Sequence, residues 1–229
     1  MSICFIVGHG KSKNGGYDSG AVCKDYHEFR IAKEIARYAQ IYYNSTYTER
    51  CELMNYEGDK YLTERISAVN NAGYDFVAEF HLNAGGGTGT ECYHHIGGAE
   101  GEKYAAKISA AISETLGIKN RGAKTKTGSD GRDYFAIIRE TKPTAVLIET
   151  AFIDTADVEL INTPDGQKKC GEAIAKAVAK VRNAQLKAAA ENEKIYRVQV
   201  GAFKNYDNAL ALLDKLKFIG FKDAFIKWE

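Results

Sequence analysis

Short apolar segments rich in β-branched residues alternate along this chain with amphipathic stretches of roughly a dozen or more residues. Strands and helices that alternate in this way fold as an α/β protein, with a twisted, mostly parallel sheet and helices on both faces. Strands are predicted at residues 3–7, 76–81, 90–95, 134–139 and 145–150. Helices are predicted at residues 26–43, 60–72, 100–116 and 166–186, and a surface loop at residues 121–133.

The composition changes after the last of these helices. Residues 184–194 include Lys-Ala-Ala-Ala-Glu-Asn-Glu-Lys without an apolar stripe, which predicts a linker. Beyond the linker, the pattern predicts a strand at 196–203, a helix at 206–219 and a second strand at 223–228. Residues 195–229 are therefore expected to form a small β-α-β module, which is too short to bury a substantial core alone.

The composition also excludes several function classes. A formal net charge of +1 gives no sign of a general nucleic-acid binder, and no apolar run reaches the length of about 18 residues that membrane insertion requires. The N-terminus lacks a basic region and a cleavage site, so we expect a protein made in the cytoplasm without a signal peptide. Five scattered cysteines without a C-x-x-C pair predict reduced, structural thiols.

Three side chains with metal-binding chemistry fall at corresponding places in this pattern. His9 follows the first strand, His81 ends a later strand, and Glu28 lies in the first turn of the first helix. In α/β sheets, sites form beyond the carboxyl ends of the strands, where these three groups can converge. Two imidazoles and one carboxylate are a recurring ligand set for catalytic zinc.

Glu149 is the fourth polar residue of interest. It lies near the carboxyl end of the apolar strand at 145–150, where an ionised carboxylate needs a partner. A nearby Zn²⁺ or its water would supply that partner, and the carboxylate could accept a proton as the water attacks a carbonyl.

Other interpretations of these residues remain open on spacing alone. A single histidine after a strand is more often structural than a ligand, and Glu28 also fits an acid that complements the helix dipole. His27 and Glu79 are rival ligands, although Glu79 shares a strand face with His81 and could support it instead. The adjacent pair His94-His95 points to opposite faces of a strand and is a poor chelator.

Several motifs, in this order, resemble a known family. They are Phe5-Ile6-Val7-Gly8-His9-Gly10, the helix-opening Glu28, Phe80-His81-Leu82-Asn83-Ala84, Asn120-Arg121-Gly122, and Lys142-Pro143-Thr144-Ala145-Val146-Leu147-Ile148-Glu149. The ordered set resembles the zinc-dependent N-acetylmuramoyl-L-alanine amidases of the amidase-3 type, and especially the catalytic domains of clostridial phage endolysins. The resemblance covers roughly residues 1–182, so residues 1–183 are expected to form a zinc amidase catalytic domain.

The resemblance implies an activity and a role for each matched residue. His9, Glu28 and His81 would bind Zn²⁺, and Glu149 would be the catalytic carboxylate. The expected reaction is cleavage of the amide between the lactyl group of N-acetylmuramic acid and L-alanine of the peptidoglycan stem peptide.

Substrate contacts are expected from residues beside these positions. Asn83 is expected to support the site or to contact substrate, and Arg121 is a candidate for binding stem-peptide carboxylates, together with Lys124 and Lys126. A solvated basic loop explains the three cations equally well.

The C-terminal segment resembles the first half of a SPOR domain, a module that binds peptidoglycan. The resemblance rests on Tyr196-Arg197-Val198-Gln199-Val200-Gly201-Ala202-Phe203 and on the apolar residues of the helix that follows. A whole SPOR domain has two β-α-β halves, so a single half would allow a homo-oligomer. The alternative is a strand and helix packed on the catalytic domain.

These expectations suggest a phage or prophage endolysin, made in the bacterial cytoplasm and acting on the cell wall after release. A sporulation amidase that lyses the mother cell fits the same features. Two further alternatives are a non-catalytic wall-binding protein and a zinc peptidase that cuts within the stem peptide.

Overall fold

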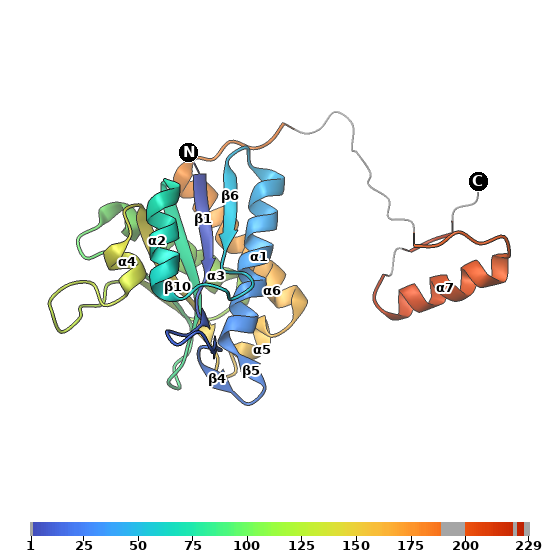
Figure 1. Cartoon of the computed structure of the whole chain (residues 1–229), viewed down its shortest axis with the longest axis horizontal. Helices are drawn as coiled ribbons and strands as arrows, with labels where there is room; N and C mark the ends of the chain where they lie inside the picture. The colour runs from blue at the N-terminus through green and yellow to red at the C-terminus, as the bar shows by residue number, and fades with distance from the viewer. Residues whose placement is uncertain (1, 189–199, 222–223, 227–229) are drawn as a thin grey trace. The chain divides into compact units, whose positions relative to one another are not determined.

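The computed structural model describes residues 2–188, 200–221 and 224–226 (Figure 1). The chain forms two compact units, Met1–Lys187 and Ala188–Glu229. Within the described ranges, the helices are too short or too polar to cross a membrane.

The first unit is built on a six-stranded sheet with the order β6-β1-β7-β10-β8-β9. Its strands are β1 (Ser2–Val7), β6 (Arg50–Met54), β7 (Phe76–Asn83), β8 (Thr90–His94), β9 (Asn120–Lys124) and β10 (Thr144–Phe152). β6, β1, β7 and β10 are parallel, β8 is antiparallel to β10, and β9 is parallel to β8. The prediction of a mostly parallel sheet in an α/β fold is confirmed.

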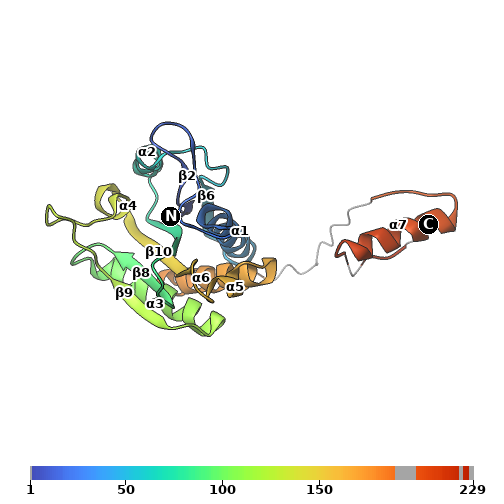
Figure 2. The same cartoon turned by 90° about the horizontal axis from the view of Figure 1, so that it is seen from below.

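Helices cover both faces of this sheet (Figures 1 and 2). One face carries α1 (Glu28–Thr46), α3 (Ala99–Leu116) and α6 (Pro164–Arg182), and the other carries α2 (Leu62–Ala72) and α4 (Ala136–Glu140). A short helix, α5 (Val158–Ile161), follows β10. Two small ribbons, β2 (Gly10–Lys11) with β3 (Tyr17–Asp18) and β4 (Val22–Cys23) with β5 (Tyr26–His27), connect β1 to α1.

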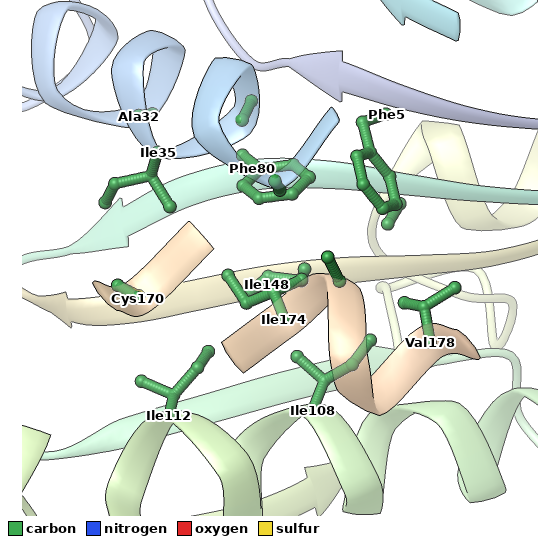
Figure 3. Close-up of a cluster of buried hydrophobic side chains, with 14 of the residues drawn as sticks. Phe5, Ala32, Ile35, Phe80, Ile108, Ile112, Ile148, Cys170, Ile174 and Val178 are labelled. Atoms are coloured by element: carbon green, nitrogen blue, oxygen red, sulfur yellow. The ribbon is translucent and has the colours of Figure 1, made fainter. Parts of the chain in front are cut away.

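The larger hydrophobic core lies between the sheet and the three long helices (Figure 3). Every second residue of the central strands points into it, because side chains alternate between the two faces of a strand. Figure 3 labels core residues of β1, β7 and β10 (Phe5, Phe80, Ile148), of α1 (Ala32, Ile35), of α3 (Ile108, Ile112) and of α6 (Cys170, Ile174, Val178).

A smaller core lies on the opposite face, under α2 and α4. It consists of Cys4, Ile6, Ile66, Val69, Val77, Ile137, Ile138, Ala145 and Leu147. Farther along β7 and β10 on this face, the side chains become polar, so the small core ends where Glu79, His81 and Glu149 begin. This change from apolar to polar determines where a site can form.

The predicted strand at 134–139 is wrong, because this segment contains helix α4. Ile138 N and Arg139 N both donate to Phe135 O (3.1 and 3.0 Å), which closes a helical turn. A short apolar run has no periodicity that separates a buried strand from a buried helical turn. Ile137 and Ile138 are buried in either case, here in the smaller core.

The predicted loop at 121–133 is wrong in its first part, because β9 pairs with β8 along the edge of the sheet. Gly122 has φ +82° and adjoins a shift in register, and none of the β9 residues is fully buried. An edge strand held by backbone pairing shows little apolar alternation, and the same holds for β6 at the other edge, which was not predicted.

Residues 185–187, which were predicted as linker, pack on the first unit. Thr48 N donates to Gln185 O (2.9 Å), Lys187 N donates to Thr46 O (2.8 Å), and Leu186 forms a β-bridge with Tyr47. α6 ends before them at Arg182, where Asn183 adopts a left-handed conformation (φ 52°). The end of α6 is thus tied to the end of α1.

The second unit contains helix α7 (Tyr206–Phe218), close to the predicted helix at 206–219. Asn205 caps it by accepting a hydrogen bond from Asp207 N (2.7 Å), and none of the helix residues is buried. The predicted strands at 196–203 and 223–228 fall partly outside the described residues. Residues 200–203 and 224–226, which are described, are not in strands.

Candidate metal and catalytic site

Three polar side chains from neighbouring strands lie on the face of the sheet that carries α2 and α4. His81 of β7 is paired in register with Glu149 of β10, and Glu149 is paired with Glu91 of β8. Residues directly opposite one another on paired strands point to the same face. His81, Glu149 and Glu91 therefore form one polar row across the sheet. The row lies within the strands, because β7 continues to Asn83 and β10 to Phe152.

His9, Glu28 and His81 meet at one end of this row. Glu28 Oε1 lies 3.2 Å from His9 Nε2 and 2.8 Å from His81 Nδ1, and the two imidazole centroids are 4.9 Å apart. One donor atom from each residue lies within 4.8 Å of the others. The spacing and chemistry of these donors suit a divalent cation such as zinc.

Backbone geometry holds His9 and Glu28 in place. His9 has φ 61°, and Asn55 fixes the turn by donating to Val7 O (2.7 Å) and His9 O (2.8 Å). Glu28 begins α1 and accepts hydrogen bonds from Leu82 N (3.0 Å) at Oε1 and from Ala21 N (2.8 Å) at Oε2. Both groups are therefore positioned by hydrogen bonds with the surrounding chain.

Each imidazole has a second carboxylate on its other nitrogen. His9 Nδ1 lies 2.9 Å from Asp18 Oδ2, and His81 Nε2 lies 3.3 Å from Glu79 Oε2. Arg65 links the two sides, because it donates to Glu79 Oε1 (3.0 Å) and to His9 O (3.1 Å). Carboxylates in this position are typical of histidines that bind zinc, where they fix the ring and its tautomer.

Two glycines make room for this arrangement. A Cβ at Gly8 would lie 2.2 Å from His81 Cε1, and a Cβ at Gly20 would lie 2.6 Å from Glu28 Oε2 and 2.7 Å from His9 Cδ2. These three distances are far below van der Waals contact, so a side chain at Gly8 would displace His81, and one at Gly20 would displace Glu28 and His9.

The electrostatics of the three donors favour positive charge between them. Burial raises the pKa of Glu28, but hydrogen bonds with His81 and His9 outweigh burial and hold the pKa well below its ordinary range. Burial lowers the pKa values of both imidazoles, but the interactions with Glu28, together with those of Asp18 for His9 and Glu79 for His81, outweigh burial and raise them. A cation placed among these donors would satisfy the same need for positive charge.

Glu149 lies next to the three donors but differs from them in its hydrogen bonding and in its pKa. Its Oε2 atom is buried and has no hydrogen-bond partner among the described residues. Burial raises the pKa of Glu149, the charge of His81 lowers it and the charge of Glu28 raises it, and together these effects bring the pKa to about 7. A carboxylate with a pKa near neutrality can accept and return a proton at physiological pH.

A cavity of about 400 Å³ opens onto these groups. The starts of α2 and α4 form its walls, through Tyr61, Leu62, Phe135 and Ala136, and its floor carries His9, Glu28, His81, Asn83 and Glu149. A larger cavity of about 680 Å³ beside β6 carries none of these floor residues.

The predicted substrate contacts are organised by Glu91, which the sequence analysis did not single out. Asn83 Nδ2 donates to Glu91 Oε1 (2.8 Å), and Arg121 Nε donates to Glu91 Oε2 (2.5 Å). Lys124 shares that second oxygen (2.5 Å), whereas Lys126 lies over the Tyr134 ring, 4.0 Å from its centroid. The sequence pattern could have identified Glu91 in the same way as Glu149, because both place a carboxylate inside a predicted strand. No comparable pattern marks Asp18.

The rival histidines lie outside the donor set. His27 belongs to β5, His94 Nδ1 lies 3.0 Å from His95 O, and His95 pairs with Asp133. Among the described residues, the group His9, Glu28 and His81 alone has metal-binding spacing. Glu79 supports His81 from the side opposite Glu28, as the sequence analysis allowed.

Comparisons with known proteins indicate the family of this chain. The family Amidase_3, described as N-acetylmuramoyl-L-alanine amidase, matches residues 3–180, and the SPOR domain matches residues 172–228. The sporulation-specific N-acetylmuramoyl-L-alanine amidase of Bacillus subtilis (strain 168) is 30% identical over 212 residues, which cover 91% of this chain and 79% of that protein.

Two solved structures are also similar. Cwp6 from Clostridium difficile aligns with a TM-score of 0.71 and 29% identity, over 79% of this chain and 29% of that chain. The catalytic domain of the CD27L endolysin targeting Clostridia difficile aligns with a TM-score of 0.61 and 29% identity, over 82% of this chain and 99% of that chain.

Proposed function

Because the chain belongs to the N-acetylmuramoyl-L-alanine amidase family, we propose that it cleaves the amide between the lactyl group of N-acetylmuramic acid and L-alanine of the stem peptide. We propose Zn²⁺ as its cofactor, held by His9, Glu28 and His81. The observation that carries the proposal is the position of Glu149, whose buried Oε2 atom has no hydrogen-bond partner among the described residues, beside these three donors in one cavity.

Glu149 and the three metal donors have defined tasks in this reaction. A bound Zn²⁺ would polarise the scissile carbonyl and lower the pKa of the attacking water toward about 7. Glu149 Oε2 accepts a proton from that water as the carbon–oxygen bond forms. The same carboxyl then returns the proton to the nitrogen of L-alanine as the carbon–nitrogen bond breaks.

The supporting residues keep the donors oriented during these steps. Asp18 and Glu79 hold the two imidazoles from their outer nitrogens, and Arg65 holds Glu79. The Arg65 and Glu79 side chains are only 5% and 2% exposed, so this support is shielded from water.

Substitution of Glu149 by glutamine tests the assignment. Glu149→Gln should bind zinc as the wild type does and release stem peptides from purified wall at a rate lower by roughly 100- to 10,000-fold. Mass spectrometry of wall digested by the wild type should show free muramic lactyl groups and new L-alanine amino termini. New termini inside the stem peptide would indicate a peptidase, and absence of products would indicate a wall-binding protein.

We propose that the protein acts as a phage or prophage endolysin, which reaches the wall after release from the bacterial cytoplasm. The similarity to an endolysin catalytic domain supports it. A sporulation amidase is the second candidate, because a relative with that name is similar over 91% of the chain. Transcription during phage lysis or during sporulation distinguishes the two.

We propose that the C-terminal unit binds peptidoglycan, because the SPOR match extends to residue 228. The match starts at residue 172, inside α6, so its first part lies in the first compact unit. A chain ending at Lys187 should keep its activity on soluble muropeptides and sediment less with insoluble wall. Unchanged sedimentation would contradict a binding role.

A further inference from the structure

The buried carboxylate of Glu91 has no task in the reaction described above. Its side chain is 3% exposed, and it lies next to Glu149 in the polar row. Burial removes hydration from this carboxylate, and Glu149 carries like charge on the adjacent strand, so Glu91 needs polar and cationic partners. The identity of these partners indicates what the position can do beyond stabilising the fold.

Glu91 gathers four polar side chains around its two oxygens. Asn83 and Tyr93 donate to Oε1 (2.8 and 2.9 Å), and Arg121 and Lys124 donate to Oε2 (both 2.5 Å). These residues come from β7, β8 and β9. We refer to Glu91, Asn83, Tyr93, Arg121 and Lys124 as the Glu91 cluster.

The cluster carries one negative and two positive charges, so it has an excess of one positive charge. The side chains of Arg121 and Lys124 remain 30% and 33% exposed, so the cluster is open to solvent on this side. Among the described residues, Arg121 uses Nε for its bond to Glu91 and makes no hydrogen bond through its two terminal nitrogens. The Phe152 ring, 5.2 Å from the guanidinium carbon, holds the group in place.

The position of the cluster relates this excess charge to the reaction. Directly opposite residues on antiparallel strands have Cα atoms about 4.5–5.5 Å apart, so Glu91 lies one strand beyond Glu149 on the side away from the metal donors. Asn83 connects the two, because it lines the cavity and donates to Glu91. A stem peptide whose L-alanine nitrogen lies at Glu149 reaches the cluster with its next residue, about 3.5 Å farther along the chain.

We infer that Glu91 is a positioning residue that presents Arg121 and Lys124 to a free carboxylate on the second residue of the stem peptide, and so selects substrates that carry this charge. The inference rests on the proposed amidase function. In peptidoglycan this second residue is a γ-linked D-glutamate, whose α-carboxyl group is either free or amidated. The free form places an anion where the cluster has an excess of one positive charge, and the amidated form does not.

Two soluble muropeptides that differ in this group provide the test. The wild-type enzyme should cleave a disaccharide tripeptide with α-carboxyl D-glutamate with kcat/KM roughly 10- to 100-fold above that of the α-amidated form, the range expected for a charge-assisted hydrogen bond. Arg121→Gln and Glu91→Gln should both bring this ratio close to one, mainly through KM. Arg132→Gln is the matched control, because Arg132 pairs with Asp130 on the surface and should keep the wild-type ratio.

A binding measurement separates positioning from general damage to the fold. Glu149→Gln should bind the free-carboxyl muropeptide more tightly than the amidated one in calorimetry, and the added Arg121→Gln substitution should remove the difference. Equal cleavage of both muropeptides by the wild type, or a wild-type ratio in Arg121→Gln, would overturn the inference while the amidase function stands. If the wild type cleaves neither the two muropeptides nor the purified wall, the proposed function itself is overturned.

Discussion

Replacement of Gly8 by alanine should disable the site with very little added volume. The new Cβ would lie 2.2 Å from His81 Cε1 and 2.3 Å from His81 Nε2. Non-bonded carbon atoms settle at about 3.5–4.0 Å, so the imidazole must retreat by about 1.3 Å or the backbone must shift by a similar amount. His81 Nδ1 lies 2.8 Å from Glu28 Oε1, so such a shift opens the donor set.

The size of the effect follows from this displacement. A misplacement of about 1 Å in a catalytic site costs roughly 100-fold in rate. Disturbed support of a metal ligand costs roughly 10- to 100-fold in metal affinity. We therefore expect Gly8→Ala to hydrolyse purified peptidoglycan roughly 100-fold more slowly and to bind Zn²⁺ roughly 10- to 100-fold more weakly.

The assay combines release of amino groups from purified wall with zinc affinity from competition with a chromogenic chelator. Gly16→Ala is the matched control, because its Cβ would meet Ser12 Oγ at 3.5 Å, an ordinary contact. A thermal melt confirms that each variant is folded. A folded Gly8→Ala protein with wild-type zinc affinity and wild-type turnover would refute the reasoning.

Three further predictions concern metal, ion pairs and pH. Removing zinc by dialysis against a chelator should lower the melting temperature, and restoring free Zn²⁺ to about 100 times its Kd should recover about 2.7 kcal/mol, or roughly 5–10 °C. Arg182→Ala should lower the free energy of unfolding by about 3–5 kcal/mol in urea titrations, because it leaves the largely buried Glu49 without its cationic partner and with the Tyr43 hydroxyl alone. The surface variant Lys169→Ala should change it by less than about 1 kcal/mol. Burial raises the pKa of Glu91, but hydrogen bonds from Lys124, Arg121 and Tyr93 lower it to about 2, against 4.5 ordinarily. Its stabilisation is therefore complete above pH 4.5 and decreases as the pH falls toward 2, and Glu91→Gln should flatten this part of the curve of unfolding free energy against pH.

The sequence was most informative where burial and periodicity agree. β1 and β7 were predicted within two residues of their ends because they are continuous apolar segments, and α1 and α3 within three residues because their apolar residues recur at helical spacing. The edge strands β6 and β9 leave no such pattern, since backbone pairing holds them. The segment around Ile137 and Ile138 is apolar in any fold, so its burial was predictable and its helical geometry was not.

The candidate site shows the same division. The sequence pattern identified four site residues because each is a polar group at or near the end of a predicted strand or in the first turn of a predicted helix. They are His9, Glu28, His81 and Glu149, and the structure brings all four to one cavity. Arg121 was a candidate for binding substrate, and Asn83 was expected to support the site or to contact substrate. Their common partner Glu91 becomes apparent only when strands β7, β8 and β9 are placed in the sheet. Register across a sheet depends on tertiary pairing that a single sequence does not encode locally.

The pairing of residues 185–187 with the segment after α1 bears on how this protein can be recombined with others. A chimaera that carries a different wall-binding segment should be joined after Lys187, because a junction at residue 183 or 184 would discard the bonds from Thr48 to Gln185 and from Lys187 to Thr46. Those bonds hold the end of α6 against the end of α1. Ile174 and Val178, earlier in α6, lie in the larger core. The natural place for exchange is therefore a few residues later than the end of the last helix suggests.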